Sequence, residues 1–478
     1  ERAERPPISY LSRVDPVRRE IERLLAWRRG EAPGPLRLHL VLTERCNLTC
    51  RSCFMGQLPP RTRDQELDDA TLERVVDQAI ELGVEELYLV GGEILVRPEI
   101  ALSVMTRVKE AGLRGDLTTN GTRLDDGVVQ RLVDMGWDRV QVSLDGPDPA
   151  SNDALRPPAG SFERTVAGVR RLVRARGGAP TPEIGLTTVV SADNWRQLPA
   201  MVDLAAELGA SEATFQALKD MSPECEAMGL DRSALAGLAD VVAAAIERAG
   251  HHGLATNAGD LLQPALVDDR GLDEALRDDV DRLDDPLFAA HCYLPWTTMV
   301  VHFDGRVSPC WEWRGDELGN VREVPLGEIW QGEVFGRWRQ DFLAGRMPDH
   351  CRQCCLGFVD HIRWVRLEGL LAAADHAQAL AFADQLLAWQ PAHRHAAVAR
   401  AKALLGLGRG DDAEAWVREC LDRRVPDRSL ERAYLIDVLF DGDRRAAAVE
   451  LADSLLADAP RTGPVAAAAR RLARKLGS

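Results

Sequence analysis

Short apolar runs alternate with longer amphipathic stretches over the first half of the chain. Between Leu36 and about Gly250, each run is rich in β-branched residues and is followed by a stretch with helical periodicity. This alternation is typical of repeated βα units around a parallel sheet, an α/β fold. We expect six strands, at 36–42, 86–90, 115–119, 139–144, 183–190 and 212–217. Loops at the carboxyl ends of such strands converge on one mouth, where we expect the chemistry.

The rest of the sequence divides into regions of different composition. We expect an N-terminal helical extension at 1–35, the barrel at 36–250, an acidic connector at 251–289, a region with clustered cysteines at 290–366, and an all-α region at 367–478. In the extension, Asp15-Pro16 predicts the start of a helix.

Similar phrases recur in the last region. They end at Pro391, Pro426 and Pro460, which are 35 and 34 residues apart, near the tetratricopeptide period. We therefore expect tetratricopeptide-like (TPR-like) pairs of helices. Such helices would bind a protein partner, form a dimer, or only cap the barrel.

Composition restricts the class of protein. The formal net charge of −16 argues against broad binding to nucleic acid or to an anionic membrane, and it would tolerate a cationic substrate. Ten cysteines are too few for a disulfide scaffold of this size, and their C-x2-C groupings suit metal binding in a reducing compartment. The chain has neither an apolar run of transmembrane length nor a signal-like N-terminus. We expect a soluble cytoplasmic protein.

Three cysteines, Cys46, Cys50 and Cys53, follow the first expected strand within eight residues. Three thiolates on one tight loop can hold three corners of an iron–sulfur cube. Because no fourth ligand is nearby, one iron would stay open to a small molecule, which makes the loop a candidate for catalysis. The alternatives are a zinc knuckle, which prefers four ligands in two pairs, and ordinary buried cysteines.

This stretch resembles the radical S-adenosylmethionine (SAM) superfamily, whose motif is C-x3-C-x2-C after the first strand of a partial (β/α)6 TIM-like barrel. The resemblance implies a [4Fe–4S] cluster that binds SAM and cleaves it to a 5′-deoxyadenosyl radical, which abstracts hydrogen from substrate. It also implies an electron donor such as flavodoxin or ferredoxin. The family usually has an aromatic residue before the third cysteine. Here Ser52 stands there, so we expect Phe54 to help hold the adenine.

The same resemblance implies SAM-binding residues at the other strand ends. Gly91-Gly92-Glu93 matches the family's Gly-Gly-Glu-Pro motif, with Ile94 in place of proline. The glycines would let the backbone approach the SAM amino group, and Glu93 would accept a hydrogen bond from it. A plain strand-to-helix turn is the alternative.

Three further positions follow from this resemblance. Ser143 would contact the ribose or carboxylate of SAM, and Arg156 would pair with that carboxylate. Asn120 either contacts the cofactor or only forms an Asn-Gly turn.

A second group of cysteines comprises Cys292, Cys310, Cys351 and Cys354, enough to ligate a cluster completely. Residues 300–310 predict a hairpin with Asp-Gly at its turn and Cys310 after its second strand. This segment resembles the auxiliary-cluster module called SPASM, or its shortened form, twitch. Because the later cysteines of the full module are absent, twitch with one auxiliary [4Fe–4S] cluster fits better. Structural zinc is the rival, and Cys355 competes with Cys354 for the fourth position.

Two clusters in one enzyme suggest oxidation, because the second can take an electron from the substrate radical. Enzymes with this cysteine spacing resemble the dehydrogenases of aminocyclitol and aminoglycoside antibiotic pathways. The leading hypothesis is therefore a radical SAM dehydrogenase that oxidises a secondary alcohol of a cationic aminocyclitol or amino sugar to a ketone. The alternative is a maturase that cross-links or epimerises a ribosomally made peptide, and a third class is an inactive scaffold. No catalytic residue can be named from the sequence.

Overall fold

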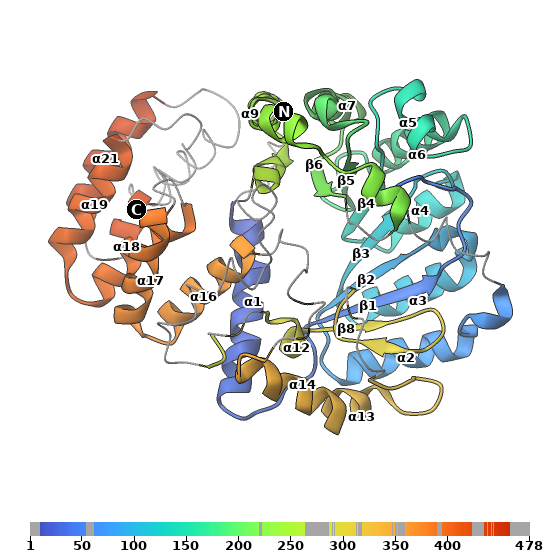
Figure 1. Cartoon of the computed structure of the whole chain (residues 1–478), viewed down its shortest axis with the longest axis horizontal. Helices are drawn as coiled ribbons and strands as arrows, with labels where there is room; N and C mark the ends of the chain where they lie inside the picture. Colours follow the sequence, from blue (N-terminus) through green and yellow to red (C-terminus); the bar gives the residue numbers. More distant parts are fainter. Residues whose placement is uncertain are drawn as a thin grey trace. The chain divides into compact units, whose positions relative to one another are not determined.

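The fold is described from a computed structural model of the chain (Figure 1). The residues that the structure describes are 10–53, 62–218, 222–262, 286–288, 290, 292–311, 313, 318–346, 348, 351, 359–389, 394–422, 435–436, 438–440, 442 and 444–458. The chain forms two compact units. One comprises 32–273 and 292–357, and the other comprises 1–31, 274–291 and 358–478.

The first unit is built on a nine-stranded sheet with the order β7-β6-β5-β4-β3-β2-β1-β8-β9. Its strands are β1 (Arg37–Thr43), β2 (Glu86–Gly91), β3 (Arg114–Thr119), β4 (Arg139–Ser143), β5 (Glu183–Val190), β6 (Glu212–Ala217), β7 (Ala255–Thr256), β8 (Thr298–Val301) and β9 (Val307–Ser308). All neighbours are parallel except β8 and β9. The α/β prediction is confirmed, and the six expected strands agree within one residue at each end.

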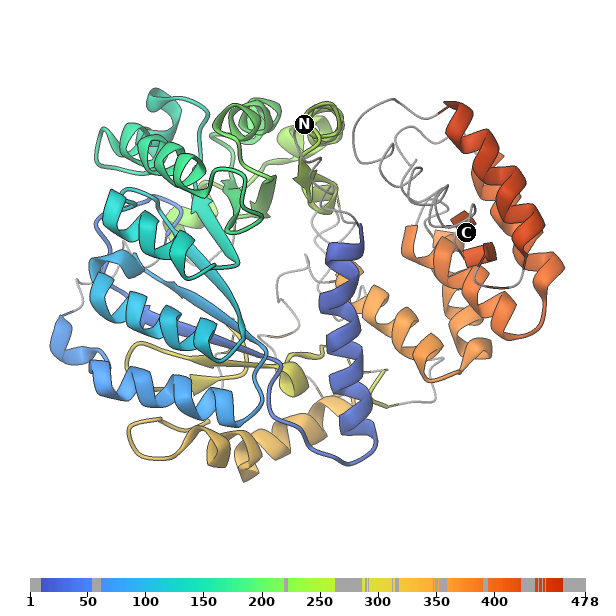
Figure 2. The same ribbon diagram turned by 180° about the vertical axis from the view of Figure 1, so that it is seen from behind.

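Helices cover one face of this sheet (Figures 1 and 2). They are α2 (Asp69–Glu81), α3 (Pro98–Glu110), α4 (Asp126–Asp134), α5 (Pro149–Leu155), α6 (Ser161–Arg176), α7 (Leu198–Leu208), α8 (Pro223–Ala227) and α9 (Arg232–His252). Aspartate caps start several of them; for example, Asp68 accepts from the N–H of Thr71. Leu38 and Leu40 of β1 are fully buried, whereas His39 between them is partly exposed. The alternation assigns one face of β1 to the core and the other to the barrel interior.

The expected hairpin is confirmed, and it extends the barrel sheet. Strand β8 pairs in parallel with β1, and β9 pairs with β8 in the antiparallel direction. Gly305 has a φ of 92°, which suits the turn, and Cys310 follows β9. Three helices belong to the same region: α12 (Leu294–Thr297), α13 (Leu326–Gln331) and α14 (Glu333–Leu343).

The second unit is helical. It contains α1 (Tyr10–Arg28), α16 (Val359–Ala372), α17 (His376–Trp389), α18 (Arg394–Gly406), α19 (Gly410–Asp422) and α21 (Arg445–Asp458). Helix α1 begins at Tyr10, so the start expected at Asp15-Pro16 is wrong; the proline removes one hydrogen bond without ending this helix. Most of the acidic connector and the three repeat prolines lie outside the described residues.

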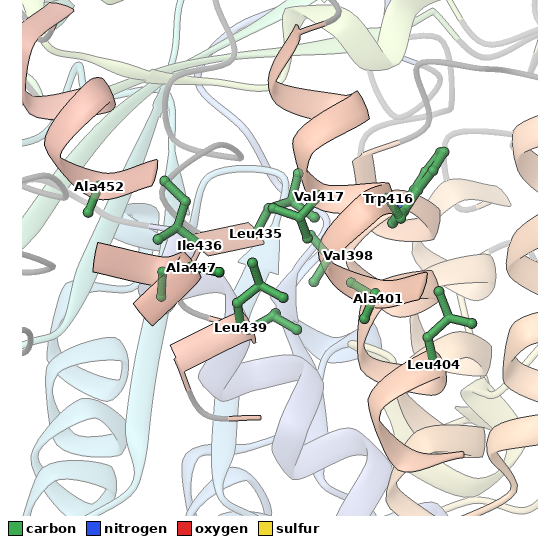
Figure 3. Packing of buried hydrophobic residues seen from close by; sticks show 13 residues of the cluster. Val398, Ala401, Leu404, Trp416, Val417, Leu435, Ile436, Leu439, Ala447 and Ala452 are labelled. Carbon is green, nitrogen blue, oxygen red and sulfur yellow. The ribbon is translucent and has the colours of Figure 1, made fainter. Parts of the chain in front are cut away.

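The expected helical repeat is visible in the second unit. Helices α17, α19 and α21 begin at residues 376, 410 and 445, so the intervals are 410 − 376 = 34 and 445 − 410 = 35. Figure 3 shows side chains of α18, α19 and α21 converging on one core, with Val417, Leu435 and Leu439 among its buried members. Among the helices that the structure describes, none is long and apolar enough to cross a membrane.

Candidate active site

The cysteine loop, residues 44–53, follows β1 directly. The thiols of Cys46, Cys50 and Cys53 are free, and the N–H of Cys53 donates to the carbonyl of Cys50 at 3.1 Å, which closes a turn. The Cys46 sulfur accepts from the N–H of Leu48 at 3.4 Å. Burial raises the pKa of Cys50 to about 11, while the guanidinium of Arg156 acts in the opposite direction.

These donors fit an iron–sulfur cube. Within the described ranges, no group of three or more His, Cys, Asp or Glu side chains is close enough to hold a single metal ion. A cube needs a different arrangement, because each of its thiolates binds a different iron. Three free thiols on one loop, with the N–H of Leu48 directed at the Cys46 sulfur, are a donor set that fits a cube.

The backbone of the cysteine loop is held from two sides. On one side, Thr49 and Arg51 donate their N–H groups to the carbonyls of Pro157 and Leu155 at 3.0 and 2.9 Å. On the other side, the N–H of Glu93 donates to the carbonyl of Arg45 at 2.9 Å. The end of β2 and the segment at the end of α5 thus fix a loop that begins at the end of β1.

The glycines of Gly91-Gly92-Glu93 have a role that the sequence did not suggest. A Cβ on Gly91 would lie 2.2 Å from the carbonyl oxygen of Thr43, and one on Gly92 would lie 2.4 Å from that of Arg45. Gly91 also has a φ of 151°, which side chains rarely adopt. The glycines therefore allow the end of β2 to approach the cysteine loop itself. Whether they also approach SAM stays a prediction.

The Glu93 carboxylate is fully buried and organises the strand ends. It accepts from the hydroxyl of Thr119 at 2.9 Å and from the backbone N–H groups of Asn120 and Leu95 at 2.7 and 3.0 Å. Burial raises the pKa of this carboxyl, and the N–H donors act against that effect. Its predicted contact with the SAM amino group is not tested by these contacts.

Asn120 links the end of β3 to the cysteine loop. Its amide nitrogen donates to Asn47 at 2.9 Å and lies 3.8 Å from the Cys46 sulfur. Its amide oxygen accepts from the hydroxyl of Thr122 at 2.7 Å. The sequence suggested either a cofactor contact or a turn for Asn120, and neither interpretation included its contact with Asn47. The following Gly121 has a φ of 74°, as expected for an Asn-Gly turn.

Ser143 is the last residue of β4, and Arg156 directly follows α5. The guanidinium Nε of Arg156 donates to the buried Asp145 carboxylate at 2.6 Å. Asp145 in turn accepts from the N–H of Val189 at 2.8 Å. Ser143 ends β4 and is partly exposed. The ion pair with Asp145 was missed by the sequence analysis, and the contacts of Arg156 and Ser143 with SAM remain predictions.

The barrel interior is polar along β3 to β6. Arg139 donates to Asp116 at 3.2 Å and to Glu212 at 2.7 Å. Gln141 also donates to Glu212, at 2.7 Å, and accepts from the Thr187 hydroxyl at 2.9 Å. A barrel filled by its own core has mostly branched apolar residues at such positions. This interior is therefore lined at these positions by polar side chains that bond one another.

The second cysteine group is described in part. Cys292 precedes α12, Cys310 follows β9, and Cys351 lies beyond α14. Burial raises the pKa of Cys351 to about 11. Cys354 and its competitor Cys355 lie outside the described residues, as does Phe54.

An aromatic group near Cys310 was also missed. Trp311 is 41% exposed, and its indole N–H donates to His39 Nδ1 at 3.0 Å. The His39 ring stacks on Tyr88, with centroids 4.7 Å apart. Burial and the charge of Arg37 lower the pKa of His39 to about 3, so the ring is neutral at pH 7. The alternation within β1 and β2 could have placed His39 and Tyr88, but nothing in the sequence indicated Trp311.

Two protein families match this chain. Residues 40–205 match the radical SAM superfamily, and residues 292–355 match SPASM, an iron–sulfur cluster-binding domain. The SPASM match agrees with the expected auxiliary region. The number of clusters that this region holds stays a prediction.

Individual proteins are similar over between about a third and two thirds of the chain. "PqqA peptide cyclase" of Gluconobacter oxydans is 30% identical over 335 residues, which cover 67% of this chain and 82% of that protein. "AdoMet-dependent heme synthase" of Methanosarcina barkeri is 35% identical over 169 residues, covering 35% and 46%. Streptococcus suis SuiB bound to S-adenosylmethionine matches with a TM-score of 0.51 at 16% identity, covering 70% of this chain and 74% of that one. At that identity the likeness shows the fold alone.

These relatives do not support the leading hypothesis from the sequence. We expected similarity to aminocyclitol dehydrogenases, and the extended matches are instead to proteins named for cyclising a peptide. The cysteine spacing that suggested a dehydrogenase is set by the cluster-binding fold, so it does not report on the substrate. The inferences of an alcohol substrate and of antibiotic biosynthesis, which rested on that spacing, are therefore without support.

Proposed function

Since this chain belongs to the radical SAM superfamily and carries a SPASM domain, we propose that it is an enzyme that modifies a peptide. The observation that carries this proposal is the relative named PqqA peptide cyclase, 30% identical, of which the chain covers 82%. The peptide would be a ribosomally made precursor, and the modification a cross-link or an epimerisation.

The cofactors are a [4Fe–4S] cluster that binds SAM, SAM itself, and auxiliary iron–sulfur ligation in the SPASM domain. When bound, SAM and its cluster supply a 5′-deoxyadenosyl radical that removes a hydrogen atom from an unactivated C–H bond. Cys46, Cys50 and Cys53 would hold the SAM-binding cluster. Cys292, Cys310, Cys351 and Cys354 would hold the auxiliary cluster.

The residues around the cysteine loop would fix its geometry and charge. Asn120 donates toward Cys46, and Arg156 brings a positive charge to the side of Cys50. A buried cation beside a thiolate favours the ionised form that binds iron. Asp145 keeps the Arg156 guanidinium in place through the 2.6 Å hydrogen bond.

The polar barrel interior supports a peptide substrate. A peptide carries a donor and an acceptor on each residue, and burying them requires partners in the site. Gln141, Thr187 and Glu212 provide both kinds of group on the inner face of the sheet. They would orient the peptide so that one C–H bond faces the mouth of the barrel.

The experiment uses the full chain, reconstituted anaerobically with iron and sulfide. It is incubated with SAM, a reductant and candidate precursor peptides encoded beside its gene, and in parallel with a panel of aminocyclitols. We expect 5′-deoxyadenosine and a modified peptide. A cross-linked peptide loses the mass of a pair of hydrogen atoms. An epimerised peptide keeps its mass, and chiral analysis of its amino acids after hydrolysis shows the inverted residue. Ketone formation from an aminocyclitol, with every peptide unchanged, would reject the proposal.

A further inference from the structure

We propose that Glu66 is a positioning residue that holds the cysteine loop and the auxiliary hairpin in one fixed arrangement. The auxiliary hairpin is defined here as residues 298–310, from β8 to Cys310. Glu66 precedes α2 and belongs to neither element. The inference rests on Cys46, Cys50 and Cys53 binding the SAM-site cluster, and it does not depend on the identity of the substrate.

The side chain of Glu66 is directed at the base of the cysteine loop. Its carboxylate accepts a short hydrogen bond from the Thr43 hydroxyl. It also accepts from Arg45 Nε at 3.1 Å and from Arg45 Nη2 at 3.0 Å, a two-pronged pair. Thr43 and Arg45 are the third and first residues before Cys46. This carboxylate therefore helps to fix the position of the first cysteine, together with the bond from the N–H of Glu93 to the carbonyl of Arg45.

Burial makes these contacts hard to replace. The Glu66 side chain is 0% exposed, and its second cation, Arg97, is 6% exposed. Arg97 Nη1 lies 3.4 Å from the carboxylate and 3.2 Å from the carbonyl of Leu42 in β1. A buried charge that loses its partner is strongly destabilising, because water does not reach it. The buried Glu66 carboxylate therefore depends on these two guanidinium groups, whereas Arg97 also pairs with Asp69 and the Arg45 side chain is 30% exposed.

The backbone of the same segment is bonded to the auxiliary hairpin. The N–H of Leu67 donates to the carbonyl of Phe303 at 2.7 Å. Arg322 donates to the carbonyl of Glu66 at 2.8 Å and to that of Asp304 at 3.1 Å. Phe303 and Asp304 form the turn of the hairpin that leads to Cys310. One residue pair, Glu66 and Leu67, therefore contacts both cysteine-bearing elements.

This arrangement matters because a reaction site must be held within about 0.5 Å of its productive geometry. A loop of ten residues, 44–53, does not reach that precision without fixed contacts at its base. Glu66 supplies them and ties the loop to the hairpin through its own backbone. Changing Glu66 should therefore alter the SAM site before it alters the fold.

The test compares Glu66→Gln with Glu73→Gln. Glu73 lies in α2 and also accepts from a hydroxyl and an arginine, Ser103 at 2.6 Å and Arg107 at 3.2 Å. These partners belong to α3, not to either cysteine-bearing element. Both proteins are reconstituted without substrate. SAM binding is titrated, and the EPR spectrum of the reduced SAM-site cluster is recorded with and without SAM.

For Glu66→Gln we expect wild-type iron content, SAM binding weaker by about 10-fold or more, and a changed EPR response to SAM. For Glu73→Gln we expect wild-type values in all measurements. Wild-type SAM affinity and EPR response in Glu66→Gln would overturn the proposal, as would equal effects in both variants.

A second variant keeps the proposal testable if Glu66→Gln does not fold. Arg322→Gln removes the side-chain bridge between Glu66 and the hairpin, and it leaves both the carboxylate and the bond from Leu67 to Phe303 intact. The hydrogen bond that joins Arg322 to Asp304 is exposed. We expect unchanged SAM affinity, together with a broader distribution of distances between the two reduced clusters in pulsed EPR. A distribution as narrow as that of the wild type would overturn the proposed role of the Arg322 bridge in tying the hairpin to this segment.

Discussion

The two groups of cysteines are built in different ways. Cys46, Cys50 and Cys53 lie within eight residues of one loop. Cys292, Cys310 and Cys351 come from three segments, with separations of 310 − 292 = 18 and 351 − 310 = 41 residues. The first group can form as soon as the strand ends around it are in place. The second needs the hairpin and the helices after it to be packed.

Their surroundings differ as well. The cysteine loop is supported by buried polar groups, with Asn120 and Glu66 each making several hydrogen bonds. The auxiliary region is supported by aromatic packing around α14, where Arg339 lies over the rings of Trp330 and Phe335 at 4.2 and 4.6 Å. Burial lowers the pKa of Arg339 to about 9. Loss of one polar group should thus damage the first site more than the second.

The largest expected difference between the two sites comes from removing the three cysteines of the cysteine loop. Replacing Cys46, Cys50 and Cys53 by alanine should reduce the iron content from about eight to about four per chain and abolish SAM cleavage. The remaining iron should belong to the auxiliary site. Iron and sulfide analysis after anaerobic reconstitution measures this. Wild-type iron in the triple variant, or zinc in the second site, would break the comparison.

The converse variant is Cys310→Ala. It should also lose about half the iron, while SAM cleavage persists because the cysteine loop is untouched. Formation of 5′-deoxyadenosine in the presence of reductant measures the remaining site. If SAM cleavage disappeared in a folded variant, the two sites would not be independent.

A smaller effect is expected from the charge beside Cys50. Arg156→Ala should weaken SAM binding by about 1.5–3 kcal/mol, the size of a lost hydrogen bond to a charged group, without loss of iron. The control is Arg170→Ala, because Arg170 forms an exposed ion pair with Glu207 on the outer helices. Isothermal titration with SAM checks both. An unchanged dissociation constant would remove Arg156 from the SAM site.

The smallest expected effect concerns packing of the loop. Gly92→Ala places a methyl group 2.4 Å from the carbonyl oxygen of Arg45 and should cost about 1–3 kcal/mol of unfolding free energy. Gly127→Ala, in α4, meets only Asp125 at 3.5 Å and should be neutral or stabilise by about 0.5–1 kcal/mol. Urea unfolding of the two variants gives the difference. Equal unfolding free energies of the two variants would mean that the cysteine loop can shift to make room for the methyl group on residue 92.

The sequence predicted the parts of this molecule that depend on local pattern. Apolar alternation located six strands within one residue, and the spacing of Cys46, Cys50 and Cys53 identified the family. An Asp-Gly pair predicted the hairpin, but the pairing of β8 with β1 depends on contacts between distant segments. Glu66 was not predicted for the same reason, since its partners lie about 20 and 30 residues away.

The reaction class also was not readable from local pattern. Cysteine spacing reflects how a cluster is held, whereas in the proposed function the substrate would meet side chains of the barrel interior such as Gln141 and Glu212. These residues look like ordinary polar positions in separate strands, and only the parallel register brings them together. Similarity over 67% of the chain, to a protein named for cyclising a peptide, favours the peptide alternative where the motif did not.

The pairing of β1 with β8 has a consequence for how the chain is made. The first residues of these strands are separated by 298 − 37 = 261 positions. At a synthesis rate of about 5–20 residues per second, β8 therefore leaves the ribosome about 13–50 s after β1. During this time β1 has β2 on one side and an open edge on the other, and an open edge can pair with other chains. The nascent protein therefore carries an aggregation-prone edge beside its cysteine loop until β8 emerges. Expression at low temperature or with chaperones should raise the yield of protein that accepts iron.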